Sequence, residues 1–152
     1  MPRVQHLLEQ LKLKEDRDVR DDLHRTLLQV AYYASKKTYS PYSNFPVGAA
    51  LLDRSGRVFT GCNVENASYG GVICAERTAI VKAVSEGSLE YELIAVVCQK
   101  TKDAWPCGIC RQFISEFGRD IKVIAEGLDG EILVMSVSDL LPKMFGPHQL
   151  PH

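Results

Sequence analysis

The stretch GGVICAERTAIVKAV, residues 70–84, predicts a helix with an unusual first turn. Apolar residues recur in it at helical spacing, and Gly87 shortly afterwards is typical of a helix end. A thiol, Cys74, opens the segment, and a carboxylate, Glu76, follows two residues later. A carboxylate at that place, before any solvent-facing stripe has begun, requires a chemical reason.

Around this helix, hydrophobic patterns predict the other elements of an α/β domain. Helical periodicity predicts two more helices, over about 22–36 and 107–117, and a last helical turn at 137–141. Period-two or continuous apolar runs predict strands at 47–53, 57–62, 93–99, 121–127 and 131–136. The run at 93–99, LIAVVCQ, is apolar throughout, as in a strand covered on both faces. Helices between strands indicate a layered α/β domain with a mixed sheet.

The N-terminal residues differ in pattern from this domain. Val4, Leu7, Leu8 and Leu11 have the spacing of a short amphipathic helix, and a charged run, EDRDVRDD, follows at 15–22. We therefore expect residues 1–21 to be an N-terminal extension, helical or mobile, and residues 22–152 to form the domain.

Composition excludes several classes of function. The protein has 152 residues and a formal net charge of -1, so a basic surface that tracks nucleic acid is not expected. Its apolar runs are far shorter than the roughly 20 residues that span a bilayer, and its N-terminus lacks the apolar core of a secretory signal. We expect a cytoplasmic protein with no membrane partner. Its 5 cysteines, an odd number, do not suggest a disulfide framework. Cys62 and Cys98 fall in predicted strands, where we expect buried, inert thiols.

A second motif, WPCGICRQF at residues 105–113, supplies two more thiols in a C-x-x-C spacing. Alone, this spacing fits zinc ligation, a redox dithiol or two buried thiols at a helix start. Cys74 heads one predicted helix, and Cys107 with Cys110 heads the next, where helix dipoles stabilise thiolates. A redox pair would not need a third cysteine beside a carboxylate. We therefore favour zinc held by three thiolates, with the fourth position open as in catalytic sites.

Glu76 has a role in such a site. It lies two residues after the ligand Cys74, on the first turn of the same predicted helix. From there its carboxylate can reach a water at the open position without binding the metal. It would act as the proton shuttle. The pattern C-A-E with P-C-x-x-C matches the three-cysteine variant of the zinc-deaminase signature.

Longer segments resemble the small, three-cysteine, homotetrameric class of cytidine deaminases. These are YSPYSNFPVGAALL (39–52), GCNVENASYGGVICAERTAIVKAVSEG (61–87), PCGICRQFISEFG (106–118) and LLPKMFGP (140–147). The resemblance implies hydrolytic deamination of cytidine and deoxycytidine to uridine and deoxyuridine plus ammonia, in pyrimidine salvage. It also implies one zinc per subunit and a three-layer cytidine deaminase-like fold, in which helices flank a mixed five-stranded sheet.

The resemblance also implies which residues bind the nucleoside. Asn63 and Glu65 match a pair that binds the ribose, and Phe45 matches an aromatic residue beside the pyrimidine, although a core Phe at a strand start is an equally good interpretation of that residue. The backbone N–H of Ala75 would hold the base carbonyl, and the backbone carbonyl oxygen of Trp105 would face the amine. A tryptophan is not expected at position 105, so its side chain would alter the rim of the pocket.

Three further residues match supporting positions. Arg77 would donate to a ligand sulfur and offset the excess negative charge of three thiolates. Phe145 would reach the base in the site of a neighbouring subunit of a homotetramer, and Tyr69 would lie near that subunit junction. A surface arginine and a loose hydrophobic tail are the alternatives for Arg77 and Phe145.

Other functions remain open at this stage. A deaminase of a related cytosine-bearing compound would share the metal motif, although the pair Asn63 and Glu65 favours a plain nucleoside. A polynucleotide deaminase would need a cationic path that the charge balance does not provide. A binding module with a structural zinc would need a fourth protein ligand, and no Cys or His near the motifs offers one.

Overall fold

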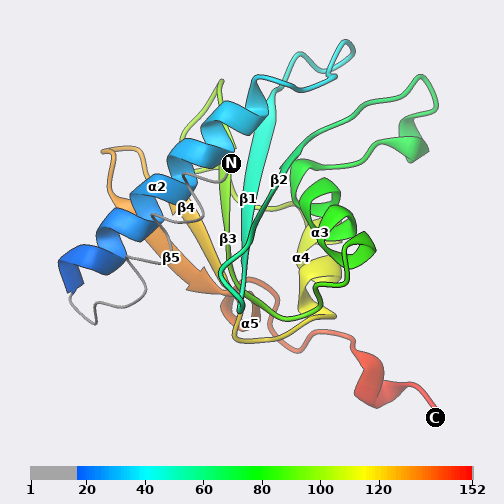
Figure 1. Cartoon of the computed structure of the whole chain (residues 1–152). Helices are drawn as coiled ribbons and strands as arrows, with labels where there is room; N and C mark the ends of the chain where they lie inside the picture. Colours follow the sequence, from blue (N-terminus) through cyan, green and yellow to red (C-terminus); the bar gives the residue numbers. More distant parts are fainter. Residues whose placement is uncertain (1–16, 152) are drawn as a thin grey trace.

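The computed structural model describes residues 17–151, and the side chains of residues 21–151. Its centre is a five-stranded sheet in the order β2-β1-β3-β4-β5 (Figure 1). The strands are β1 (Val47–Asp53), β2 (Val58–Cys62), β3 (Tyr91–Cys98), β4 (Lys122–Glu126) and β5 (Ile132–Ser136). Only β3 and β4 pair in parallel, and the other neighbours are antiparallel. The predicted mixed sheet is confirmed.

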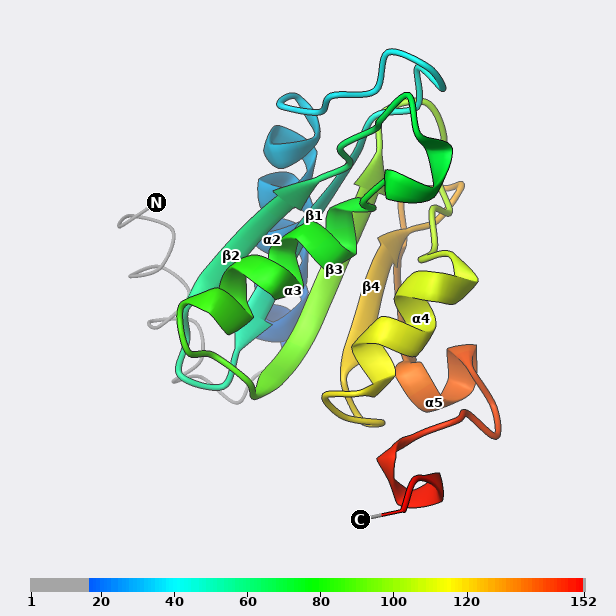
Figure 2. The same cartoon turned by 90° about the vertical axis from the view of Figure 1, so that its right-hand side faces the viewer.

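Helices cover both faces of the sheet and produce three layers. Helix α2 (Arg17–Ser35) lies on one face, whereas α3 (Ala75–Ser85) and α4 (Gly108–Ser115) lie on the other (Figures 1 and 2). A single turn, α5 (Val137–Leu140), follows β5, and two short 3-10 helices are η1 (Tyr69–Gly71) and η2 (Pro147–Gln149). The three-layer fold expected from the resemblance is therefore present.

Each face of the sheet has its own hydrophobic core. Alternate residues of one strand point to opposite faces, so Leu51 of β1 packs toward α3 and Leu52 packs toward α2. In β3, Ile94 belongs to the α3 core and Ala95 to the α2 core, and both are fully buried. The prediction that the run at 93–99 is covered on both faces is confirmed.

Two glycines allow the helices to approach the sheet closely. A Cβ atom on Gly48 of β1 would lie 1.9 Å from the backbone oxygen of Ala31 in α2. A Cβ atom on Gly61 of β2 would lie 2.2 Å from the backbone oxygen of Ala75, the first residue of α3. Since real contacts of that length do not occur, glycine at position 61 sets how closely the first turn of α3 packs on the sheet.

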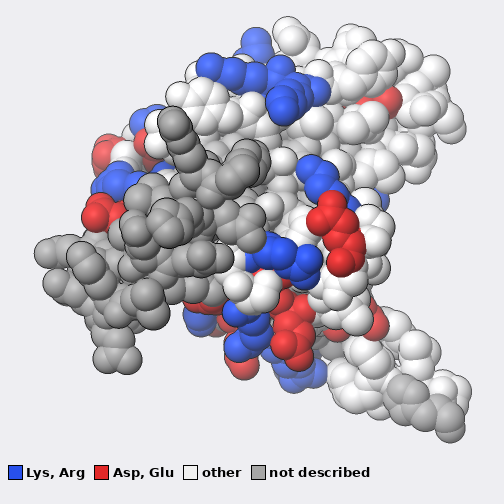
Figure 3. Space-filling view, in the orientation of Figure 1, with Lys and Arg blue, Asp and Glu red and all other residues white. Residues whose placement is uncertain are grey.

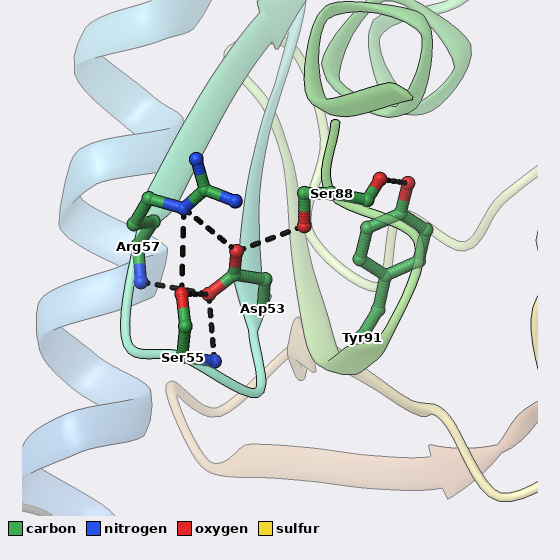
Figure 4. Close-up of polar contacts among 5 residues, drawn as sticks. All are labelled: Asp53, Ser55, Arg57, Ser88 and Tyr91. Atoms are coloured by element: carbon green, nitrogen blue, oxygen red, sulfur yellow. Dashed lines mark hydrogen bonds and ion pairs between the residues drawn. The ribbon is translucent and has the colours of Figure 1, made fainter. Parts of the chain in front are cut away.

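The turn between β1 and β2 is held by a buried carboxylate. Asp53 accepts hydrogen bonds from backbone and side-chain groups of Ser55 and Arg57 and from the Ser88 hydroxyl (Figure 4). Burial acts to raise the pKa of Asp53, but the hydrogen bonds from Ser55, Ser88 and Arg57 outweigh it and lower the pKa below its usual value. The Tyr91 hydroxyl donates to the backbone oxygen of Ser88 and links the same turn to β3.

Element bounds differ from the predictions by a few residues. Helix α2 begins at Arg17 rather than at residue 22, and α4 ends at Ser115 rather than at residue 117. The predicted amphipathic segment at residues 4–11 lies outside the described residues, and the division between an extension and a domain stays a prediction. No helix within residues 17–151 is long and apolar enough to cross a bilayer.

Candidate metal centre and active site

The topology explains why thiols that are far apart in the sequence meet. Strands β2 and β3 both pair antiparallel with β1, so they run in the same direction. Helix α3 follows β2 and α4 follows β3, on the same face of the sheet (Figure 2). The N-termini of both helices therefore lie at the same end of the sheet, where the sequence places Cys74 and Cys107.

The thiols occupy the helix starts themselves. Cys74 is the N-cap residue of α3, Cys107 is the N-cap residue of α4, and Cys110 lies in the first turn of α4. Two backbone hydrogen bonds between Val64 and Ile73 fix the segment immediately before Cys74. The unpaired amides of a helix start stabilise negative charge, which favours thiolates at these positions.

The sulfur atoms are spaced as zinc ligands. The Sγ atoms of Cys74, Cys107 and Cys110 all lie within 4.8 Å of one another, and those of Cys74 and Cys107 are 3.8 Å apart. Zn–S bonds of about 2.3 Å in a tetrahedron place two sulfurs about 3.8 Å apart. All three cysteines are free thiols, and theirs is the only such cluster among residues 17–151. These residues fit a zinc ion with one position left for another ligand.

Charges around the sulfurs are arranged to hold thiolates. The pKa of Cys74 is lowered to about 5, mainly because the Cys110 thiol donates a hydrogen bond to its sulfur. Burial acts in the opposite direction, and a hydrogen bond from Arg77 lowers the pKa further. The contact between the two thiols, together with burial, raises the pKa of Cys110. Arg77 donates from Nη2 to the Cys74 sulfur at 3.3 Å and to the Val72 backbone oxygen at 3.3 Å. The buried Nε of Arg77 has no partner among the described residues, so this guanidinium faces the sulfurs with donors to spare.

Glu76 places a buried carboxylate beside the sulfurs. Its side chain is only 3% exposed, and the Cys110 thiol lies 3.6 Å from its Oε2 atom. Burial is the main cause that raises the pKa of Glu76 to about 7, and the nearby Cys74 charge acts in the same direction. A carboxyl group that titrates near neutral pH can both accept and donate a proton there.

A cavity of about 570 Å³ opens in front of the sulfurs and Glu76. Most residues predicted to bind substrate or metal line it, namely Phe45, Asn63, Glu65, Cys74, Ala75, Glu76, Trp105 and Cys107. They come from segments before β1, after β2, at the start of α3 and before α4. The structure therefore brings these predicted residues together in one site, large enough for a small molecule.

Asn63 and Glu65 also hold the wall of the cavity. The Asn63 amide donates to the Phe45 backbone oxygen and accepts from the Val47 N–H. Glu65 accepts from the backbone N–H of Tyr42 and from the N–H and hydroxyl of Ser43. Both side chains are 8% exposed. The Thr38 hydroxyl also donates to the Asn63 Oδ1 atom, and both N–H groups donate to the Glu65 Oε1 atom, so one amide N–H of Asn63 and one lone pair of the Glu65 Oε2 atom remain for a ligand. Their predicted role with the ribose stays a prediction.

Tyr69 and Phe145 do not line this cavity. Tyr69 is 75% exposed and packs edge to face on Tyr42, beside an adjoining hollow that Ser43 and Glu65 share. Phe145 is 54% exposed, and its backbone oxygen accepts a hydrogen bond from the Gln112 amide of α4. Their predicted roles between subunits stay predictions.

Sequence reasoning missed three residues that shape the site. Ser43 and Asp103 line the cavity, and Arg111 donates to the backbone oxygens of Pro106 and Leu140. The acid in TKDAWP, close before the C-x-x-C motif, was a signal for Asp103.

Cys62, expected to be buried like Cys98, is partly exposed, with its Sγ 3.5 Å from the Lys37 backbone oxygen. It lies at the end of edge strand β2, which leaves one side of the thiol open. The prediction of a buried thiol is therefore confirmed for Cys98 and wrong for Cys62.

A family model, similar proteins and solved structures all relate this chain to cytidine deaminases. The family described as "Cytidine and deoxycytidylate deaminase zinc-binding region" matches residues 21–126. A cytidine deaminase of Halalkalibacterium halodurans is 48% identical over 120 residues, which are 78% of this chain and 91% of that protein. A probable cytidine deaminase of Dictyostelium discoideum is 46% identical over 125 residues, 81% of this chain and 84% of that protein.

Two solved structures of cytidine deaminases have a similar fold. The crystal structure of a cytidine deaminase from Burkholderia pseudomallei matches with a TM-score of 0.76 and 47% identity, over 80% of this chain and 98% of that protein. A cytidine deaminase from Mycobacterium tuberculosis matches with a TM-score of 0.72 and 38% identity, over 80% of this chain and 96% of that protein.

Proposed function

The chain belongs to the cytidine and deoxycytidylate deaminase family, and we propose that it hydrolyses cytidine and deoxycytidine to uridine and deoxyuridine, with release of ammonia. The observation that carries this proposal is the position of a buried carboxylate, Glu76, beside three clustered thiols on one wall of a small-molecule cavity. A structural zinc would need a fourth protein ligand, and the cluster within the described residues has three members.

Cys74, Cys107 and Cys110 would hold the zinc cofactor of the family. When bound, zinc supplies Lewis acidity, which lowers the pKa of a water at its open position. Arg77 offsets part of the negative charge of the thiolates through its contact with Cys74, and the helix N-termini offset more. This supporting role of Arg77 rests on the 3.3 Å contact between its Nη2 atom and the Cys74 sulfur.

Glu76 moves the protons of the reaction. It takes one proton from water as the water oxygen forms a bond to C4 of the pyrimidine, and it passes that proton to ring N3. As the bond between C4 and the amine breaks, Glu76 carries the second proton of the water to the departing amine, which leaves as ammonia. A pKa of about 7 suits a group that must accept and donate protons in one cycle.

The other cavity residues position the nucleoside. Asn63 and Glu65 would hydrogen-bond the ribose hydroxyls, and Phe45, 42% exposed on the cavity wall, would lie beside the pyrimidine. Ala75 is the first residue of α3, so its N–H has no acceptor within the helix and is available to the base carbonyl. The backbone oxygen of Trp105 would accept from the amine.

We further propose a homotetramer in which neighbouring subunits complete each site. Two exposed aromatic side chains, Tyr42 at 50% and Tyr69 at 75%, line the hollow beside the cavity, and large exposed apolar side chains near a site are typical of protein interfaces. Phe145 is held at its backbone but has an exposed ring, as expected of a side chain that enters a partner's site.

A cytoplasmic role in pyrimidine salvage fits the chemistry of the site. Three free thiols that must bind metal as thiolates need a reducing compartment, since oxidation would remove them as ligands. A nucleic-acid partner is not proposed. In Figure 3, acidic and basic side chains are interspersed over the lower part of the described surface and a small group of basic side chains lies at the top, whereas the upper right part, over the loops 40–46 and 64–73, is almost free of basic residues.

Ammonia release from cytidine, deoxycytidine and free cytosine, measured with the zinc content of the same preparation, tests the function. We expect turnover of both nucleosides, dependence on zinc, and little turnover of free cytosine, which lacks the ribose that Asn63 and Glu65 would bind. A metal-free protein with full activity would refute the mechanism. Turnover of none of the three compounds by the zinc-loaded protein would refute the function.

A further inference from the structure

The family joins deaminases of nucleosides with deaminases of deoxycytidylate, a nucleotide, and so it leaves the charge of the substrate open. We propose that Asp103, locked in place by Trp105, is a specificity-determining residue that excludes phosphorylated substrates from this site. The inference rests on the proposed function and deepens it, because it explains how one wall of the cavity selects neutral nucleosides.

The charged side chains that line the cavity are all acidic. They are Glu65, Glu76 and Asp103, and no lysine or arginine among residues 21–151 lines it. The loops 40–46 and 64–73, which supply Phe45 and Glu65 to the same wall, also contain no lysine or arginine. A site built for a phosphate would present cationic or amide donors to it instead.

The size of the cavity makes this charge effective. A phosphate bound within or at the mouth of a cavity of about 570 Å³ would lie within roughly one Debye length, about 8 Å at physiological ionic strength, of the wall carboxylates. Repulsion between like charges at such distances is only partly screened by salt. A neutral nucleoside does not experience it.

Asp103 cannot easily turn away from an incoming anion. Its Oδ1 atom accepts a hydrogen bond of 2.7 Å from the Trp105 indole N–H, and its own N–H donates to the Glu126 backbone oxygen at 2.7 Å. The backbone of Asp103 is left-handed, with a φ of 57°. Few residues adopt that conformation, which restricts the backbone of Asp103. Trp105 itself packs against the hydrophobic core, so its hydrogen bond also holds the Asp103 carboxylate in place.

Two basic residues that flank Asp103 in the sequence are directed elsewhere. Lys102, the neighbour of Asp103 in the sequence, pairs with Glu126 at 3.2 Å on the exposed side of the loop. Arg111 donates to the backbone oxygens of Pro106 and Leu140. Neither group lines the cavity, so neither neutralises Asp103 for a ligand bound there.

The variant Asp103→Asn tests the charge alone. Asparagine tolerates a positive φ and keeps an oxygen that can accept the indole N–H, so the loop should retain its shape. The measured quantity is kcat/KM for cytidine divided by kcat/KM for cytidine 5′-monophosphate, at low and at high salt. We expect this ratio to fall about fivefold to tenfold in the variant at low salt, and to fall less at high salt.

Two further variants serve as controls. Asp129→Asn makes the same change on the exposed β4–β5 turn, which does not line the cavity, and should leave the ratio unchanged. Trp105→Phe removes the indole N–H but keeps an aromatic ring and the backbone oxygen, and should lower the ratio by a smaller factor than Asp103→Asn.

The outcomes separate this inference from the proposed function. If the unmodified protein turns over cytidine but the ratio is the same in Asp103→Asn, then Asp103 does not select against phosphate and the inference is wrong. The same conclusion follows if Asp129→Asn lowers the ratio equally. If the unmodified protein turns over the monophosphate but not cytidine, the proposed function fails independently of the variants.

Discussion

The Sγ atom of Cys110 lies 3.6 Å from the Oε2 atom of Glu76, and the two residues come from different helices. Glu76 belongs to the first turn of α3 and Cys110 to the first turn of α4. Their distance is therefore fixed by the packing of both helices on one face of the sheet, and not by any local motif. The proposed acid–base chemistry of Glu76 and the binding of metal by Cys110 would therefore depend on the same helix packing.

Replacement of Glu76 by Gln should separate catalysis from metal binding. The amide keeps the shape of the side chain but is unable to take a proton from water, so we expect full zinc content and a loss in kcat of about 10² to 10⁴. Ammonia release and metal analysis of one preparation measure both quantities. Glu86→Gln, at the exposed end of the same helix, is the matched control. Wild-type-like turnover in Glu76→Gln would exclude the proton shuttle.

Replacement of Arg77 by Gln should loosen the metal. The variant loses the donor to the Cys74 sulfur, and loss of such a contact to a ligand lowers metal affinity by about 10-fold to 100-fold. Zinc release to a chromophoric chelator measures the effect. Arg77→Lys should release zinc at a rate between those of the unmodified protein and Arg77→Gln, because lysine keeps the charge but not the planar guanidinium group. Equal release rates in Arg77→Gln and in the exposed control Arg119→Gln would remove Arg77 from the metal site.

Replacement of Phe145 by Ala tests whether a neighbouring subunit completes the site. If the ring contacts the base, its loss should raise the Michaelis constant about threefold to tenfold, the range of one aromatic pair, while the sedimentation coefficient stays that of the unmodified protein. Deletion of residues 143–152 should raise the Michaelis constant at least as much. Leu150→Ala removes another exposed apolar side chain of the tail, 52% exposed, and should have no effect. An unchanged constant in both Phe145→Ala and the deletion would contradict the role.

Replacement of Asp53 by Asn should lower stability in a pH-dependent manner. The folded-state pKa of Asp53 is lowered, so its ionised form stabilises the fold above the unfolded-state pKa, and that contribution is lost as the pH falls through the folded-state pKa. We expect the variant to be less stable by about 2 kcal/mol at pH 7, and the difference to shrink below about pH 4. Urea unfolding at about pH 7, 5 and 3 measures it. A difference that is constant with pH would contradict the assignment.

Much of the fold could be predicted because local patterns agree with it. The apolar run at 93–99 predicts the covered central strand, and the positions of Cys74 and Cys107 at the starts of two helices follow from helical periodicity. To predict that the starts of both helices lie at the same end of the sheet, one must know that β2 and β3 run in the same direction. That follows from the antiparallel pairing of each strand with β1. No local pattern contains that information.

The residues that were missed act through tertiary contacts. Asp103 resembles an ordinary loop acid until the Trp105 indole and the Glu126 backbone are seen to hold it on the cavity wall. Asn63 and Glu65 resemble ligand-binding groups, yet each also holds the loop that carries Phe45. Such double use becomes visible only when side chains from distant segments are placed together.

The spacing of the ligands along the sequence has a consequence during biosynthesis. Cys74 and Cys107 are 33 residues apart, with the whole of β3 between them. A ribosome makes the protein from its N-terminus, so the three-sulfur site cannot exist until Cys110 has emerged and α4 has docked. Metal loading must then follow translation of this segment, and newly made subunits pass through an interval in which their thiols are open to oxidation.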